Sequence, residues 1–152
     1  MKTSYFVAIF LIVGIFLWYL NSGTSTPQYP GIVATVYKSQ QCGCCGNYVS
    51  YLRGQGFTVQ VKDVQDMTPI KQRFGIPTSM ESCHTTIIGD YVVEGHIPTE
   101  AIQKMMNEKP TIKGIAMPGM PSASPGMPGS KTAPFKIYSM MKEEGVEEYM
   151  TI

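Results

Sequence analysis

The stretch IVATVYKSQQCGCCGNYVSYL, residues 32–52, decides the fold class of this protein. Its first six residues, 32–37, form a short apolar and β-branched run, which is typical of a strand buried on both faces. Apolar side chains then recur at the spacing of one helix face, at Cys45, Tyr48, Val49 and Leu52. Gly54 and Gly56 are expected to end this helix. The motif Cys42-Gly43-Cys44-Cys45 therefore lies where a strand leads into a helix.

The chain beyond this stretch continues with alternating strand and helix patterns. The expected elements are a strand at 57–61, a helix at 66–74, a hairpin of strands at 85–88 and 91–93, and a helix at 98–109. With a cysteine before the first helix, the order β-α-β-α-β-β-α resembles the thioredoxin-like fold. We therefore expect an α/β, thioredoxin-like domain at residues 31–110.

The N-terminus carries an apolar segment that suits a membrane. Residues 5–20, YFVAIFLIVGIFLWYL, contain no charge and no proline. This length lies between a signal-peptide core and the ~20 residues that span a bilayer. Residues 1–22 are thus predicted to be a signal anchor or a cleaved signal peptide, followed by a polar linker at 23–30. Because Lys2 is the only early positive charge, the rest of the chain is expected to be periplasmic or otherwise extracytoplasmic, and tethered to the inner membrane if residues 5–20 stay attached.

Two segments follow the expected domain. Residues 111–134 are rich in Pro, Gly, Ser and Met and lack a periodic core pattern, which predicts a Met/Pro/Gly strap. Such a strap can fold over a metal site and shield it from water, and a disordered tail is the alternative. Residues 135–152 are expected to form an extra β-hairpin around Gly145.

The composition argues against some functions. Twelve Lys and Arg against 11 Asp and Glu leave a net charge of +1, without the basic excess of a nucleic-acid-binding protein. Hydrophobic residues make up 43% of the chain and charged residues 15%, so general disorder is not expected. Sulfur is abundant, with four Cys and 11 Met. An exported protein would hold these cysteines outside the reducing cytosol.

The expected strand directions bring the cysteines and histidines together. The first strand points its C-terminal end at the cysteine motif. A third strand antiparallel to it begins at that end, and a fourth strand, antiparallel again, finishes there. Cys83 and His84 precede the third strand, and His96 follows the fourth. All four cysteines and both histidines are then expected at one edge of the sheet.

Several chemistries fit the cysteines. A helix N-terminus favours thiolates. Cys42 and Cys45 could form a redox dithiol, in which Cys42 attacks a substrate disulfide and Cys45 resolves the product, although this chemistry does not need Cys44. Two structural disulfides are another reading, which the adjacent Cys44 and Cys45 make awkward. Metal binding is the third, and thiolates near thioethers and imidazoles suit Cu(I) better than tetrahedral zinc.

A set of short motifs agrees, in order, with one known family. They are Lys38-Ser39, Cys42-Gly43-Cys44-Cys45, Ser82-Cys83-His84-Thr85, Gly89 with Tyr91-Val92, Glu94-Gly95-His96-Ile97-Pro98, Pro118-Gly119-Met120-Pro121 and Ser124-Pro125-Gly126-Met127. Through them, residues 32–127 resemble the CopG-like copper-resistance proteins, also called domain of unknown function 411.

The resemblance implies an exported thioredoxin-like domain that binds copper and contributes to copper homeostasis or detoxification. By position, the implied Cu(I) ligands are Cys42, Cys44, Cys45 and Cys83. The further candidate ligands are His84, His96, Met117, Met120 and Met127. Copper ions and other exported copper-handling proteins are the expected partners. Whether electrons moving between copper and the thiols complete a catalytic cycle stays open, and a thiol-disulfide oxidoreductase that uses Cys42 and Cys45 is the alternative from another functional class.

Overall fold

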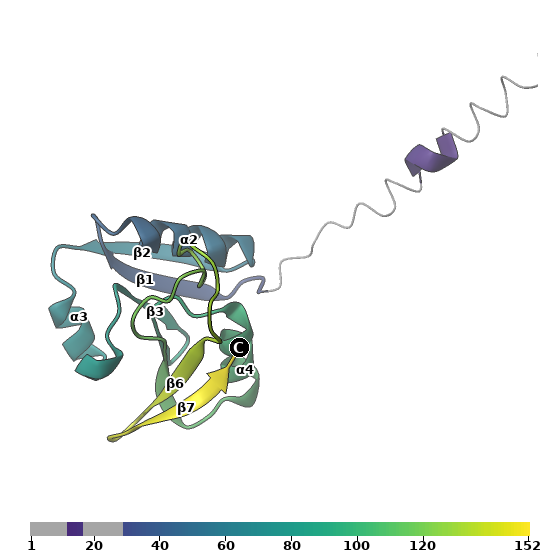
Figure 1. The fold of residues 1–152 in the computed structure, drawn as a ribbon. Coiled ribbons are helices and arrows are strands. Elements are labelled where there is room, and N and C mark those ends of the chain that lie inside the picture. The colour runs from purple at the N-terminus through teal and green to yellow at the C-terminus, as the bar shows by residue number, and fades with distance from the viewer. Residues whose placement is uncertain (1–11, 17–28) are drawn as a thin grey trace, which may run out of the picture.

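The structure, a computed structural model, describes residues 12–16 and 29–152 (Figure 1). Residues 12–16 are helical. Within the described residues, no helix is both long and apolar enough to cross a bilayer. Most of the expected anchor or signal peptide, and of the linker after it, lies outside the described residues.

The folded part is a mixed α/β structure built on one seven-stranded sheet with the order β2-β1-β3-β4-β5-β6-β7. The strands are β1 Val33–Ser39, β2 Thr58–Val64, β3 His84–Ile88, β4 Tyr91–Glu94, β5 Ile112–Ala116, β6 Lys136–Met141 and β7 Val146–Thr151. The helices are α2 Gly43–Gly54, α3 Thr68–Arg73 and α4 Thr99–Glu108, with a 3₁₀ turn, η1, at Thr78–Met80.

The strand directions agree with those from which the cysteines and histidines were predicted to lie at one edge of the sheet. β1 is parallel to β2 and antiparallel to β3, and β4 is antiparallel to β3. Lys38, near the end of β1, pairs with His84, and Thr85 pairs with Glu94 at the end of β4. The end of β1, the start of β3 and the end of β4 therefore share one edge of the sheet.

Helices α2 and α4 cover the same face of the sheet. The buried side chains of α2 are Cys45, Tyr48, Val49 and Leu52, which confirms the predicted helix face. Ile102 and Met105 of α4 are fully buried and share one core cluster with residues of α2, β1 and β4. A second, smaller cluster around Ile76 and Val92 lies on the opposite face, next to α3.

The segment after α4 differs from the expected strap at its start. Residues 112–116 form strand β5, which pairs in parallel with β4 and antiparallel with β6. The sequence pattern does not show this strand, because Ile112-Lys113-Gly114-Ile115-Ala116 neither alternates nor forms a long apolar run. Its stability comes from pairing with strands far along the chain and from burial of Ile112 and Ile115. The strap region without regular structure is the 117–130 loop and the few residues after it.

The C-terminal residues extend the sheet. β6 and β7 form an antiparallel hairpin, and Gly145 in the turn has a φ of 129°. Backbone hydrogen bonds between Phe135 and Ile152 close the open end of the hairpin, at 2.8 and 3.0 Å. The 117–130 loop follows β5 and precedes β6 in the chain. In Figure 1 this olive-green loop extends from the sheet to α2.

Candidate metal centre

Four cysteine sulfurs gather where β1 leads into α2. Cys42 and Cys45 are joined by a disulfide, and Cys44 and Cys83 are free thiols. Cys44 Sγ lies 3.5 Å from Cys42 Sγ and 3.8 Å from Cys83 Sγ. All four sulfurs lie within 4.8 Å of one another. The structure thus brings together the four cysteines that the sequence predicted at one edge of the sheet.

The start of α2 places three of these sulfurs. Cys42 is the N-cap residue, with extended backbone angles, and Cys44 and Cys45 lie in the first turn. Cys45 is fully buried, whereas Cys42 and Cys44 are half-buried. The first turn of α2 has no acidic side chain, so no carboxylate lies beside these sulfurs on the helix.

Two buried histidines lie on the other side of Cys83. Cys83 Sγ is 3.4 Å from His84 Nδ1 and 3.3 Å from His96 Nε2. The centroids of the two imidazole rings are 4.8 Å apart. Cys83 therefore belongs to two overlapping groups of possible metal ligands, one with the other three cysteines and one with the histidines.

Burial sets the protonation of these groups. Burial, with the neighbouring His96 and then Lys71, lowers the pKa of His84 to about 3, and burial also lowers the pKa of His96. Both rings are then neutral near pH 7 and can each offer a lone pair to a metal. Burial, together with Cys44, raises the pKa of the Cys83 thiol to about 12. A metal that binds Cys83 as a thiolate must displace this proton.

The three candidate methionines occupy different environments. Met117 is buried in the main core cluster, and its backbone N–H donates to the carbonyl oxygen of Glu94 at 3.0 Å. Met120 is 39% exposed, and Met127 is half-buried. Packing in the core accounts for Met117, whereas Met120 and Met127 belong to a loop that reaches α2.

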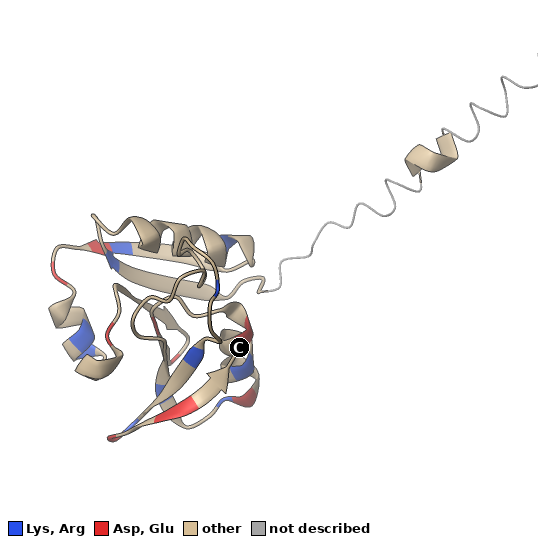
Figure 2. Cartoon of the chain, in the orientation of Figure 1, with Lys and Arg blue, Asp and Glu red and all other residues tan. Residues whose placement is uncertain are grey.

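Two hydrogen bonds hold the 117–130 loop against the site. His96 Nδ1 donates to the carbonyl oxygen of Pro125 at 2.7 Å, and Asn47 Nδ2 donates to that of Gly126 at 3.2 Å. A Cβ atom at Gly126 would lie 2.7 Å from the backbone nitrogen of Tyr48, so the loop backbone packs directly on α2. Neither residues 39–52 nor residues 114–130 contain a charged side chain, so this part of the molecule is neutral (Figure 2).

Sequence reasoning assigned no role to three residues that shape the site. Tyr48 is fully buried, its ring centroid lies 4.5 Å from that of His84, and its hydroxyl donates to the carbonyl oxygen of Ile97 at 2.9 Å. Glu94 and Lys71 form a buried ion pair behind Cys83. The burial of Glu94 could have been suspected, because this charged residue directly follows the apolar run Tyr91-Val92-Val93. The sequence around Lys71 gives no comparable indication that its side chain is buried.

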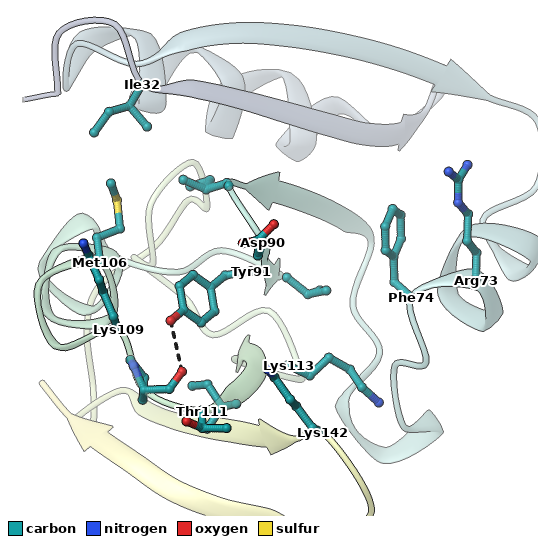
Figure 3. Close-up of a pocket in the computed structure, with 15 residues that line it drawn as sticks. Ile32, Arg73, Phe74, Asp90, Tyr91, Met106, Lys109, Thr111, Lys113 and Lys142 are labelled. Carbon is teal, nitrogen blue, oxygen red and sulfur yellow. Dashed lines mark hydrogen bonds between the residues drawn. The ribbon is translucent and has the colours of Figure 1, made fainter.

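A groove of about 960 Å³ lies at the opposite edge of the sheet (Figure 3). Its lining includes Gly89 and Asp90 of the β3–β4 turn, Phe74 after α3 and Lys109 after α4. None of the cysteines or histidines lines it. The chemistry of the sulfur cluster is therefore separate from this groove.

Comparison with known proteins gives the family. A family model described as "Protein of unknown function, DUF411" matches residues 80–127. No curated protein matches the chain. Two solved structures named "Copper resistance protein copG", form 2 and form 1, are each 34% identical to the chain in sequence. They cover 82% of this chain and 99% and 98% of their own chains, with TM-scores of 0.75 and 0.74. Because these relatives align over nearly their whole length at this identity, the chain belongs to the DUF411 family and is similar to CopG in fold.

Proposed function

We propose that the protein binds Cu(I) through Cys42, Cys44, Cys45 and Cys83 and acts in copper homeostasis or detoxification. The observation that carries this proposal is the distance between the four sulfurs, which all lie within 4.8 Å of one another. Sulfurs this close can be bridged by metal ions. Thiolates are soft ligands, and Cu(I) is a soft ion.

The surroundings of the sulfurs support a soft cation. His84 and His96 are neutral, and His84 Nε2 is buried without a hydrogen-bond partner in the described part of the chain. We assign these two imidazoles, and the thioethers of the loop residues Met120 and Met127, as secondary ligands. The neutral 117–130 loop would then limit the access of water to bound copper.

The Cys42–Cys45 disulfide gives the proposal a redox component. All four sulfurs can act as thiolates only after this disulfide gains two electrons. In the reverse direction, the two thiols would each give one electron to a Cu(II) ion. The products are two Cu(I) ions, the disulfide and two protons, which balances atoms and charge. The same cysteines could thus bind Cu(I) and reduce Cu(II).

We further propose that elements β1 to α4 form a thioredoxin-like core and that the protein works outside the cytoplasm. The β-α-β-α-β-β-α order and the antiparallel β1–β3 and β3–β4 pairs support the first part. The apolar residues 5–20 and the disulfide support the second, because disulfides persist in oxidising compartments. Other exported copper-handling proteins are the proposed protein partners.

Titration of the full-length protein with Cu(I) against a competing chelator tests copper binding. The protein is reduced first and handled without oxygen, and oxidised protein serves as the control. We expect more than one tightly held copper in reduced wild type, fewer in Cys44→Ser, and weaker binding in the oxidised protein. Equal copper retention by reduced wild type and Cys44→Ser would contradict the cluster.

The disulfide also favours a second candidate function, that of a thiol-disulfide oxidoreductase using Cys42 and Cys45. Cys44 separates the two functions, because exchange through the bonded pair does not require a third thiol. Reduction of a protein disulfide is therefore assayed in parallel with copper titration. Full disulfide turnover in Cys44→Ser, together with negligible copper retention in wild type, would establish the oxidoreductase instead.

A further inference from the structure

Behind Cys83 lies an ion pair that is almost completely shielded from water. Lys71 of α3 is 3% exposed, and Glu94 at the end of β4 is fully buried. The Lys71 ammonium contacts Glu94 Oε1. Removing two charges from water is unfavourable unless good geometry and further hydrogen bonds compensate for the lost hydration. The hydrogen bonds that the two side chains make with other residues therefore indicate the role of this ion pair.

The Glu94 carboxylate accepts hydrogen bonds from both sides of Cys83. Its Oε1 accepts from the backbone N–H of Ser82 at 2.6 Å, and its Oε2 accepts from Thr85 Oγ1 at 2.7 Å. Lys71 Nζ donates to Thr85 Oγ1 at 3.2 Å as well as to the carboxylate. One side chain thus holds the residue before Cys83 and the residue after His84.

The backbone around Glu94 ties the same segments together. Gly95 donates its N–H to the carbonyl oxygen of His84 at 3.3 Å. A Cβ atom at Gly95 would lie 2.9 Å from Ser82 Oγ and 2.7 Å from the carbonyl oxygen of Met117. The chain that leads from Glu94 to His96 therefore packs against the Ser82 segment without a gap.

Cys83 differs from the other cysteines in how it is held. Cys42, Cys44 and Cys45 are placed by the first turn of α2, whereas Cys83 lies between η1 and β3, outside any helix. Its Sγ nevertheless reaches Cys44 Sγ at 3.8 Å and His96 Nε2 at 3.3 Å. The carboxylate of Glu94 accepts from the backbone of Ser82 just before Cys83 and from the side chain of Thr85 two positions after it, and so links the chain on both sides of this residue.

We infer that Glu94, with its charge balanced by Lys71, is a positioning residue that holds Cys83 and His84 against the other three cysteines. This inference rests on the proposed copper binding for its functional meaning. Glu94 belongs to neither group of closely spaced ligand atoms, and its oxygens are hydrogen-bonded to Ser82, Thr85 and Lys71. It acts through Cys83, in the way that hydrogen-bond partners of ligands orient metal sites in other proteins.

A double-mutant cycle separates positioning from a general structural role. Cu(I) affinity is measured by chelator competition for reduced full-length wild type, Glu94→Gln, Cys83→Ser and the combined variant. We expect Glu94→Gln to weaken binding by ~10- to 100-fold when Cys83 is present. In the Cys83→Ser background the same change should alter affinity by less than about twofold. An equal loss in both backgrounds overturns the inference.

A matched control and a charge-neutral variant guard against unfolding. Glu81→Gln removes a carboxylate from an exposed position in the same segment, and it should leave the affinity unchanged. Lys71→Met/Glu94→Gln removes both buried charges and is expected to fold at least as stably as Glu94→Gln. Its affinity should stay low, because one amide oxygen cannot replace both carboxylate oxygens. Wild-type affinity in this variant overturns the inference.

Thiol alkylation provides a readout that needs no copper. In the reduced apoprotein, iodoacetamide labelling followed by mass spectrometry gives the modification rate of each cysteine. We expect Glu94→Gln to raise the rate at Cys83 by about tenfold relative to Cys44, a ratio that Glu81→Gln should not change. An unchanged ratio overturns the positioning role. If wild type binds no Cu(I), the proposed function fails while this readout still decides the role of Glu94.

Discussion

His96 donates a hydrogen bond from Nδ1 to the carbonyl oxygen of Pro125 at 2.7 Å. A carbonyl oxygen can only accept, so Nδ1 carries the proton and Nε2 of the neutral ring keeps its lone pair. His96 Nε2 lies 3.3 Å from Cys83 Sγ. This hydrogen bond therefore selects the tautomer of His96, a candidate ligand, and also links the 117–130 loop to the residue that contacts Cys83.

Removing the imidazole should loosen the loop. His96→Ala deletes one buried hydrogen bond, worth about 1 kcal/mol, which corresponds to a roughly fivefold change in an opening equilibrium. We expect amide hydrogen exchange at Ala123 and Met127, whose N–H groups donate within the loop, to become faster by about that factor. Amides of α4 serve as the internal control. Unchanged exchange in the loop would show that other contacts hold it.

Gly126 and Gly119 form a matched pair for testing the contact between the loop and α2. Both have positive φ, at 82° and 81°, so alanine is strained by ~1–2 kcal/mol at either position. Only at Gly126 would the new Cβ meet backbone, 2.7 Å from the nitrogen of Tyr48, whereas Gly119 has nothing within 4 Å. Denaturant unfolding should show Gly126→Ala to be less stable than Gly119→Ala by roughly 1–3 kcal/mol. Equal losses would mean that the loop shifts away from α2 without cost.

The thioethers of the loop can be tested by removing sulfur while keeping volume. If Met120 and Met127 ligate Cu(I), the double variant Met120→Leu/Met127→Leu should bind Cu(I) about tenfold more weakly, which is about 1.4 kcal/mol. Met106→Leu on α4, where the side chain packs against the core, is the control and should bind as wild type does. Chelator competition with reduced protein measures all three. Equal affinities would assign the loop a covering role only.

The stability of the metal-free protein should fall on acidification because of His84. Its ring is surrounded by Cys83, His96, Tyr48 and, at longer range, Lys71, and its pKa falls from 6.5 to about 3 on folding. Below pH 6.5 the unfolded chain binds a proton that the folded protein does not, so this contribution is complete above pH 6.5 and is lost toward pH 3. At 1.36 kcal/mol per pKa unit, roughly 3 kcal/mol disappears by pH 4.

Glu94 works in the opposite direction. Burial raises the pKa of Glu94, against the effect of Lys71, so the folded protein takes up a proton at this carboxylate more readily than the unfolded chain does. This uptake stabilises the folded state on acidification and offsets part of the loss caused by His84. Urea unfolding at several pH values, in wild type and His84→Gln, separates the two groups. The variant should show a clearly flatter fall between pH 6.5 and 4. A slope identical to that of wild type would exclude His84 as the main cause.

Local patterns in the sequence accounted for the elements whose stability is local. The helix face of Cys45, Tyr48, Val49 and Leu52 could be predicted because helical spacing depends on neighbouring residues. Strand β5 could not, since Ile112–Ala116 becomes a strand by pairing with β4 and β6. In both partner strands, the residues that pair with β5 lie more than twenty positions away along the chain, as the pairs Val92–Gly114 and Gly114–Met140 show. A local sequence pattern therefore does not indicate this pairing.

The sequence by itself determined which sulfur and nitrogen atoms are available as candidate ligands, and the order of strands that carries them toward one edge of the sheet. Only the tertiary structure decided which of them touch: the bonded pair Cys42 and Cys45, and the place of Cys83 between Cys44 and the histidines. It also placed Lys71 and Glu94 behind Cys83. Ångström-scale distances depend on packing between remote segments, and a buried charge is explained only by the partners that surround it.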